Sequence, residues 1–519
     1  MLKKRILWAD DEIELLQSHI LYLQTRGYEV ETVTNGDDAI GKFAEGNFDI
    51  VLLDEMMTGK DGLATLQEIK NISPQIPVIM ITKNEEERLM EDAIGQKIDD
   101  YLTKPVNPSQ ILLACKKILD SKNIATEQKS RKYTEELKQF SERLSTPLNH
   151  KDWIELNLNL FKWDLEIDSS MEPQYREIFN DQRRECNVEF GKFIEKNYQN
   201  WIWKKEEPPL LSTDLVKKYI IPELRQKQNV ILLVIDCLRL DQWLVLEPFF
   251  YDYVNVIRDY YFSILPTATP FSRNAIFSGL FPEEIEQKYP ELWVRDDEDE
   301  NSLNKYEKEL LEQNLQRNGI NLERGIKYIK IMNNDDARYL EKNLNSFMDT
   351  PLLAVVLNFV DVLAHSRSDL PILKEIAPNE SAYRSLTRSW FEHSPMFNVM
   401  REMAKSDRTF FITTDHGSIR GMRGTRVIGD RESSTNLRYK YGRSLKVERK
   451  NAIYVKNPSD FKLPRRGINT TYIIAKEDYY FIYPTNYNKY LNYYKDSFQH
   501  GGASMEEMIL PFIRLERKG

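Results

Sequence analysis

Cysteine is scarce in this sequence. The 519 residues include three cysteines, Cys115, Cys186 and Cys237, and no two of them are close in the chain. Three dispersed thiols provide neither a disulfide framework nor a thiolate metal site. We therefore expect a cytoplasmic protein whose fold does not depend on disulfides.

Long apolar runs are also missing. No stretch reaches the roughly 18 consecutive apolar residues that a membrane-spanning helix needs. At the start of the chain, the basic residues before Ile6 are followed only by the short apolar run Ile6–Ala9 and then by Asp10. That run is too short for the apolar core of a signal peptide. The sequence predicts neither a membrane span nor a secretion signal.

An excess of positive charge is absent as well. The net charge is −9 and the isoelectric point is near 5.5. A dedicated duplex-DNA binder normally has a basic face, so this balance argues against one, although a locally basic cleft stays compatible with it. At 41% hydrophobic and 29% charged residues the chain is typical of globular proteins. Its length predicts roughly two to four domains.

The first 120 residues alternate short apolar runs with amphipathic stretches. The runs lie at Arg5–Ala9, Glu29–Val33, Asp49–Leu53, Pro77–Ile81 and Asp100–Leu102. This rhythm is typical of a parallel sheet with helices between its strands. We expect a doubly wound α/β domain over residues 1–120, and such sheets carry their function at the carboxyl ends of the strands.

Polar residues follow four of these five runs: Asp10, Asp11, Asp54, Thr82 and Lys104. Clustered carboxylates bind hard cations such as Mg²⁺ through oxygen. A carboxylate among them can accept a phosphoryl group, whose charge the cation and a lysine would offset. A threonine hydroxyl can donate a hydrogen bond to the phosphate. The pattern predicts a phosphoryl-accepting site at Asp54.

In this order the residues resemble the motif of response-regulator receiver domains. The resemblance implies that a sensor histidine kinase phosphorylates Asp54 and that the backbone carbonyl of Met56 joins the magnesium ligands. It also implies that Thr82, Lys104 and the aromatic residue Tyr101 form the switch. Lys83 stands where a small residue is commoner, and this would alter access to the phosphate. A receiver fold that is never phosphorylated is the alternative.

From residue 121 to 208 apolar residues recur at helical spacing instead, with breaks at Ser145–Asn149 and Asp168–Pro173. This pattern predicts a helical bundle that connects two domains. The proline-containing segment Glu206–Pro209 marks its end. Four tryptophans fall in this segment: Trp153, Trp163, Trp201 and Trp203. We expect them in the core of the bundle rather than as a stacking platform for nucleobases.

Three apolar runs in residues 209–519 predict buried parallel strands: Asn229–Ile235, Leu352–Val360 and Phe410–Thr414. Metal-ligand residues follow them: Asp236, Asp361, His365, Asp415 and His416. Asp361 and His365 are four residues apart, a spacing that puts both on one face if a helical turn begins there. His500 precedes Gly501 and Gly502, which allow the backbone to approach a metal closely. The chain has six histidines, and three of them belong to this set.

A threonine-containing segment, Pro266–Asn274, leads into an apolar helix. A hydroxyl at a helix start lies close to backbone amides that stabilise anions. Metal coordination near neutral pH would turn such a hydroxyl into a nucleophile. Thr267 and Thr269 are both candidates, and the alternative for Thr269 is an N-cap.

These motifs together resemble the PglZ branch of the alkaline-phosphatase superfamily, which implies an α/β/α output domain over residues 209–519. By that resemblance one zinc ion is held by Asp361, His365 and His500, and a second by Asp236, Asp415 and His416. Mixed imidazole and carboxylate ligands suit Zn²⁺ better than Mn²⁺. Thr269 bridges toward the second ion as the nucleophile. Phe271 replaces a family proline, so Thr267 stays a candidate.

The same resemblance gives Arg273 and Asn274 as substrate-binding residues, although Arg273 could equally pair with a carboxylate. The highly charged segment Pro282–Asp349, with the acidic run Asp296–Glu300, and the segment between His365 and Ser394 are expected as insertions around the site. The tyrosine-rich stretch Tyr479–Tyr494 suits either stacking on nucleobases or packing on the sheet.

A receiver, a helical connector and a PglZ-like domain in this order resemble the PorX family of response regulators. That family implies a phosphorylation-dependent homodimer, partners among sigma factors or components of type IX secretion, and zinc-dependent phosphodiesterase activity on nucleotides or oligonucleotides. The alternative is a non-catalytic PglZ-fold scaffold that binds those partners. A DNA-binding transcription factor is disfavoured, because no helix-turn-helix is legible and the balance of charge is acidic.

Overall fold

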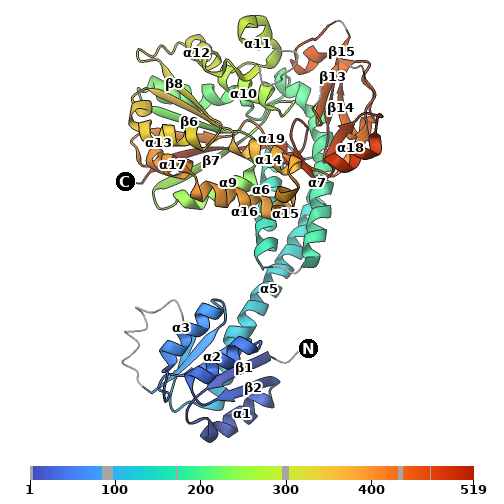
Figure 1. The fold of residues 1–519 in the computed structure, drawn as a ribbon. Helices are drawn as coiled ribbons and strands as arrows, with labels where there is room; N and C mark the ends of the chain where they lie inside the picture. Colours follow the sequence, from blue (N-terminus) through green and yellow to red (C-terminus); the bar gives the residue numbers. More distant parts are fainter. Residues whose placement is uncertain are drawn as a thin grey trace. The chain divides into compact units, whose positions relative to one another are not determined.

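The computed structural model describes residues 4–83, 98–170, 173–294, 303–429, 436–467 and 469–518. The chain divides into two compact units, Met1–Lys138 and Gln139–Gly519. The long helix α5 (Pro108–Leu144) contains the boundary between them (Figure 1). The expected domain boundaries at residues 120 and 208 stay predictions.

The first unit contains a five-stranded parallel sheet in the order β2-β1-β3-β4-β5. Its strands are β1 (Lys4–Ala9), β2 (Tyr28–Val33), β3 (Ile50–Asp54), β4 (Val78–Thr82) and β5 (Asp100–Thr103), with helices α1 (Gln17–Gln24), α2 (Gly36–Glu45) and α3 (Gly62–Ile72) between strands. Alternate residues of each strand point to opposite faces, so Trp8 and Leu7 belong to two separate apolar cores. The predicted doubly wound domain is confirmed.

Two further helices follow α5: α6 (His150–Ser170) and α7 (Pro173–Ile202). Their bounds agree with the predicted breaks. Trp153 and Trp201 are buried, Trp163 is half-buried, and Trp203 is 47% exposed. The prediction of a core position is therefore wrong for Trp203, whose indole nitrogen donates to the Asp460 carbonyl oxygen.

The second unit is built on a six-stranded sheet in the order β7-β18-β10-β6-β9-β8. Its strands are β6 (Val230–Ile235), β7 (Val254–Phe262), β8 (Ile326–Ile331), β9 (Leu352–Leu357), β10 (Thr409–Thr413) and β18 (Ile509–Arg517). β8, β9, β6 and β10 run parallel to one another, whereas β18 pairs antiparallel with β10 on one side and with the edge strand β7 on the other. The four parallel strands therefore bring their carboxyl ends to one edge of the sheet.

Helices cover both faces of this sheet, which makes the predicted three-layer α/β/α arrangement (Figure 1). They are α8 (Ile221–Arg225), α9 (Leu240–Leu246), α10 (Thr269–Ser278), α11 (Pro282–Lys288), α12 (Glu307–Arg317), α13 (Asn334–Met348), α14 (Phe359–Asp369), α16 (Glu380–His393) and α17 (Pro395–Lys405). The short helix α15 (Pro371–Ile376) packs against α14. None of the described helices is long and apolar enough to cross a membrane.

Two expectations for this unit were wrong. The run Leu352–Val360 is not one strand, because β9 ends at Leu357 and α14 begins at Phe359. The charged segment Pro282–Asp349 is not an insertion, because it contributes the edge strand β8 and the covering helices α12 and α13. The acidic run Asp296–Glu300 lies outside the described residues.

A group of small sheets, residues 419–499, lies beyond the main sheet and is here named the small-sheet subdomain. It contains β11 (Ile419–Gly421), β12 (Arg423–Arg426), β13 (Tyr439–Arg443), β14 (Ala452–Val455), β15 (Thr470–Ala475), β16 (Tyr479–Ile482), α18 (Tyr487–Tyr494) and β17 (Ser497–Gln499). Tyr480 is buried in β16, whereas Tyr490 and Tyr493 of α18 are exposed. Tyr480 therefore agrees with packing on a sheet, and stacking on nucleobases stays a prediction.

Buried polar contacts join the connector helices to the output core. Asn187 of α7 donates to both carboxylate oxygens of Glu506, at 3.2 and 3.0 Å, and accepts from the Met505 amide at 2.9 Å. Arg183 of the same helix pairs with Glu506 and with Glu380. Removing one partner of a buried ion pair typically costs about 3–5 kcal/mol. These contacts therefore fix α7 against the short helix α19 (Met505–Met508).

Candidate active sites

Three carboxylates meet at the carboxyl ends of β1 and β3 in the first unit. Ligand oxygens of Asp10, Asp11 and Asp54 lie within 4.8 Å of one another. Lys104 Nζ lies 3.0 Å from an oxygen of Asp10 and 3.0 Å from an oxygen of Asp54. Asp10 and Asp54 are buried while Asp11 is exposed, so the group opens to solvent on one side. An oxygen-only ligand set of this kind suits Mg²⁺.

Electrostatics at this group favour a bound cation. Burial is the main cause that raises the pKa of Asp54; Lys104 acts against it, and the charges of Asp10 and Asp11 add to it. A divalent ion would offset that cost and keep the acceptor ionised.

The other predicted receiver residues lie in or directly after strands β3, β4 and β5. Thr82 is buried at the end of β4, Tyr101 is half-buried in β5, and the Met56 side chain is 67% exposed after β3. Lys83 Nζ lies 3.9 Å from an oxygen of Glu12 at the surface.

In the second unit, Thr269 is the first residue of α10. Ala268, not Thr269, is the N-cap residue, and no side chain caps this helix. The alternative of an N-capping role for Thr269 is therefore wrong. A proline at the start of the helix fixes the backbone there. The Thr269 hydroxyl stays available for chemistry.

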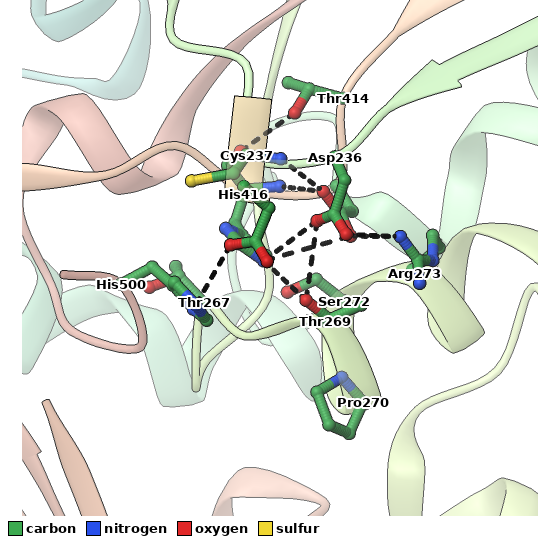
Figure 2. Close-up of polar contacts among 12 residues, drawn as sticks. Asp236, Cys237, Thr267, Thr269, Pro270, Ser272, Arg273, Thr414, His416 and His500 are labelled. Carbon is green, nitrogen blue, oxygen red and sulfur yellow. Dashed lines mark hydrogen bonds and ion pairs between the residues drawn. The ribbon is translucent and has the colours of Figure 1, made fainter. Parts of the chain in front are cut away.

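One group of ligand residues surrounds that hydroxyl (Figure 2). Ligand atoms of Asp236, Asp415 and His416 lie within 4.8 Å of one another. Thr269 Oγ1 lies 3.0 Å from His416 Nε2 and 3.4 Å from Asp236 Oδ1. His416 Nδ1 lies 3.1 Å from the Gly417 carbonyl oxygen. Because a carbonyl only accepts, Nδ1 carries the proton and Nε2 presents a lone pair to the group.

A second group lies beside the first. Asp361 Oδ1 is 3.4 Å from His365 Nε2 and 3.5 Å from His500 Nε2. Asp361 and His365 share one face of α14, as their spacing predicted. The rings of His416 and His500 stack with their centroids 4.2 Å apart, so the two groups are neighbours. The structure thus brings together the six predicted metal ligands of the output domain and the predicted nucleophile Thr269.

The electrostatics of these two groups of ligand residues favour bound cations. Burial lowers the pKa of His416 and of His500, which leaves both imidazoles neutral and able to ligate metal. Burial, followed by the charge of Asp415, raises the pKa of Asp236. Asp415 Oδ2 has no hydrogen-bond partner among the described residues. Buried carboxylates with an unsatisfied oxygen beside neutral imidazoles are a donor set that fits divalent metals.

Arg273 and Asn274 are placed differently from their predicted substrate-binding role. Arg273 is 1% exposed; its Nη1 lies 2.8 Å from Asp236 Oδ2 and its Nε lies 2.6 Å from Glu307 Oε1. The alternative of carboxylate pairing is therefore the observed one. Asn274 Nδ2 donates to the carbonyls of Pro270 and Leu303, at 3.0 and 2.9 Å, which uses both of its N–H groups.

Thr267 has a different environment from Thr269. Its hydroxyl donates to the Gly502 carbonyl at 2.7 Å and accepts from the Gly501 amide at 3.2 Å. Thr267 therefore holds the loop that carries His500. Sequence reasoning missed the supporting residues Glu307 and Glu507; Glu507 accepts from the Gly502 amide at 2.8 Å.

Gly417 allows the loop after His416 to pack against α19. A Cβ atom at this position would lie 1.9 Å from the Glu506 carbonyl oxygen. We expect Gly417→Ala to destabilise the chain by about 1–3 kcal/mol and to lower its metal content. Urea unfolding and metal analysis measure these effects.

Gly191→Ala in α7 is the matched control. Its Cβ would meet the flexible Lys476 side chain at 3.3 Å, and alanine favours the helix. Equal stability of the two variants would contradict the packing argument.

Three family models match consecutive parts of the chain. Residues 6–116 match the response regulator receiver domain, residues 123–202 the PorX response regulator linker domain, and residues 215–515 the BREX system PglZ alkaline phosphatase-like domain. The chain belongs to the PglZ family, as a PorX-type response regulator. Its receiver implies a histidine kinase as phosphoryl donor, and its PglZ domain is alkaline phosphatase-like.

Curated relatives of this PorX-type chain match its receiver. The transcriptional regulatory protein ResD of Bacillus subtilis is 36% identical over 115 residues, 22% of this chain and 48% of ResD. BaeR of Escherichia coli is 38% identical over 117 residues, 22% of this chain and 48% of BaeR. The chain thus spans about half the length of the curated relatives it matches.

Solved structures similar to the PorX-type chain are receivers too. One from Methanospirillum hungatei has 30% identity and a TM-score of 0.22, and covers 23% of this chain and 95% of its own. TrrA of Thermotoga maritima, solved with Mg²⁺ and BeF, has 35% identity and a TM-score of 0.21, and covers 22% and 99%.

Proposed function

We propose that this chain is a response regulator whose phosphorylation at Asp54 controls a zinc-dependent phosphodiesterase acting on nucleotides or oligonucleotides. The observation that carries the proposal is the position of Thr269 Oγ1, 3.0 Å from His416 Nε2 and beside two neighbouring groups of metal-ligand residues. A buried hydroxyl at a helix start, next to two cation sites, is suited to attack on phosphorus.

In this proposal Asp361, His365 and His500 hold one zinc ion, and Asp236, Asp415 and His416 hold the other. Bound zinc supplies Lewis-acid stabilisation of the charge that develops on the oxygens around phosphorus. Thr269 Oγ1 attacks phosphorus, an O–P bond forms, and the bond to the leaving alkoxide breaks; the threonine proton leaves with that alkoxide as an alcohol. Water then hydrolyses the phosphodiester that joins Thr269 to the remaining part of the substrate, which releases a phosphomonoester and restores the hydroxyl. Arg273 orients Asp236 through their 2.8 Å contact.

In this proposal the receiver domain controls the activity of the output domain. Asp10, Asp11 and Asp54, with the Met56 carbonyl, hold Mg²⁺, while Thr82 and Lys104 bind the phosphoryl group on Asp54 and Tyr101 reports its presence. We propose that phosphorylation by the kinase favours a homodimer. Its partners in the cytoplasm would be a sigma factor or a component of type IX secretion.

A substrate panel on the zinc-loaded chain tests the function. We expect turnover of phosphodiesters to exceed that of monoesters, sulfates and phosphonates. Phosphodiester turnover should fall to background after chelation and return more fully with zinc than with manganese. Turnover should also change when the chain is treated with an acyl-phosphate donor. A chain that binds zinc but turns over no member of the panel would be a non-catalytic scaffold instead.

A further inference from the structure

Arg273 brings a positive charge to the edge of one group of ligand residues, Asp236, Asp415 and His416, here named the Asp236 group. Its Nη1 lies 2.8 Å from Asp236 Oδ2 (Figure 2). The same nitrogen lies 3.7 Å from Asp415 Oδ2. A guanidinium and a divalent cation bind the same carboxylate oxygens, and their like charges repel at short range. Arg273 is therefore a competitor of any cation that binds this group.

Glu307 is a counter-ion of Arg273 that is not itself a predicted metal ligand. Its Oε1 lies 2.6 Å from Arg273 Nε, and its side chain is 1% exposed. Glu307 is the first residue of α12, where the helix dipole favours a carboxylate. α12 packs against α10, the helix that carries Arg273. The packing of these two helices therefore places a negative charge beside the guanidinium.

Three further donors surround the Glu307 carboxylate. Asn304 Nδ2 lies 2.9 Å from Oε1, the Tyr328 hydroxyl donates to Oε2, and Lys330 Nζ lies 3.7 Å from Oε2. The same Asn304 nitrogen lies 3.2 Å from the carbonyl oxygen of Thr269. A buried carboxylate with this many donors has one orientation, so the guanidinium that it binds is fixed as well.

The fixed position of Arg273 leaves one carboxylate oxygen of the Asp236 group open. Asp415 is fully buried, yet its Oδ2 has no hydrogen-bond partner among the residues that the structure describes. At 3.7 Å, Arg273 Nη1 is too far from this oxygen for a hydrogen bond. Without the charge of Glu307, the attraction of the two ligand carboxylates would draw the guanidinium onto that oxygen.

We infer that Glu307 is a positioning residue of the output domain, which holds Arg273 back from Asp415 and so keeps the Asp236 group open to a divalent cation. The inference rests on the proposed function, in which this group binds zinc. Glu307 acts through Arg273 and needs no contact with the substrate or the metal. Removal of the Glu307 charge should therefore weaken zinc binding, and removal of the Arg273 charge as well should restore it.

Glu307→Gln tests this role, because glutamine keeps the size of the side chain and an oxygen that accepts from Arg273 and Asn304. Zinc affinity is measured on the full-length chain by competition with a chromogenic chelator, with saturating Mg²⁺ to occupy the receiver. The additional change His365→Ala in parent and variant disables the second group of ligands, so the titration reports the Asp236 group. We expect the zinc affinity of this group to fall about tenfold, as is typical when a residue behind a metal ligand is lost.

The double variant Arg273→Met/Glu307→Gln separates this role from a merely structural one. It removes both charges of a buried ion pair and leaves the ligand carboxylates without a competing guanidinium. We therefore expect its zinc affinity to return to within about threefold of the parent. A loss caused only by disturbed packing would persist or grow in the double variant. Urea unfolding in the presence of a chelator measures the stability of each variant without zinc.

Glu309→Gln is the matched control, because Glu309 is an exposed carboxylate in the first turn of the same helix and the charge change is equal. Its zinc affinity should stay within about twofold of the parent, since exposed charges are screened by water and salt.

Equal zinc affinity in Glu307→Gln and the parent would overturn the inference, as would a loss that Glu309→Gln shares or that the double variant does not recover. A parent whose Asp236 group binds no zinc would overturn the inference together with the zinc assignment. A parent that binds zinc but hydrolyses no diester would refute the proposed activity alone, because the affinity comparison does not depend on turnover. The two failures are therefore distinguishable.

Discussion

Replacing Thr269 by valine should reduce phosphodiester turnover by about 10³-fold or more while metal content and fold stay unchanged. Valine keeps the branched shape of threonine and lacks only the hydroxyl. That hydroxyl does not cap α10, so its removal costs the helix no hydrogen bond at its start. Hydrolysis of a chromogenic phosphodiester, metal analysis and thermal unfolding measure the three properties.

Thr267→Val is the matched control for the nucleophile. It removes the contacts to Gly501 and Gly502 at 3.2 and 2.7 Å and should loosen the loop that carries His500. We expect weaker metal binding and partial activity that excess zinc restores. If Thr269→Val retained turnover and zinc-saturated Thr267→Val did not, Thr267 would be the nucleophile and our assignment would be reversed.

Asp54→Asn should abolish uptake of phosphate by the receiver and, with it, the phosphorylation-dependent change in oligomeric state. Asparagine retains the size of the side chain and can still accept from Lys104, which lies 3.0 Å from Asp54, but its amide cannot form an acyl phosphate under these conditions. Intact mass after incubation with an acyl-phosphate donor and Mg²⁺ measures uptake. Sedimentation over a wide range of concentration measures assembly.

Asp37→Asn is the control for this change, because Asp37 is an exposed carboxylate of α2 that pairs only at the surface with Lys60. Its phosphate uptake should equal that of the parent. Donor-dependent assembly that persists in Asp54→Asn, or phosphate that appears on another residue, would remove Asp54 from the proposed control of the output domain.

The parts of the fold that could be predicted are the strands buried on both faces, since these show as continuous apolar runs. β6, β9 and β10 are such strands. β8 was missed because it lies at the edge of the sheet, where the half-buried Lys327 and Lys330 interrupt its apolar pattern. The lysines of β8 therefore prevented its prediction as a strand.

The residues of the candidate site also divide into those that the sequence predicts and those that it does not. Asp236, Asp361 and Asp415 were predictable because the carboxyl ends of neighbouring parallel strands meet at one edge. Glu307 was not predictable: its place beside Arg273 depends on how α12 packs on α10, and nothing in the nearby sequence marks it. The exposure of Trp203 could not be predicted either, because this residue follows the last turn of α7 and helical periodicity no longer indicates which side it faces.

Glu506 has a consequence for energetics across the second unit. Its side chain is held by Asn187 and Arg183 of α7, while its backbone oxygen lies against Gly417 in the turn after His416. Cation binding and the packing of α7 against α19 are consequently thermodynamically coupled. If bound cations favour the seated position of α7 by some factor, seating of α7 must raise cation affinity by the same factor.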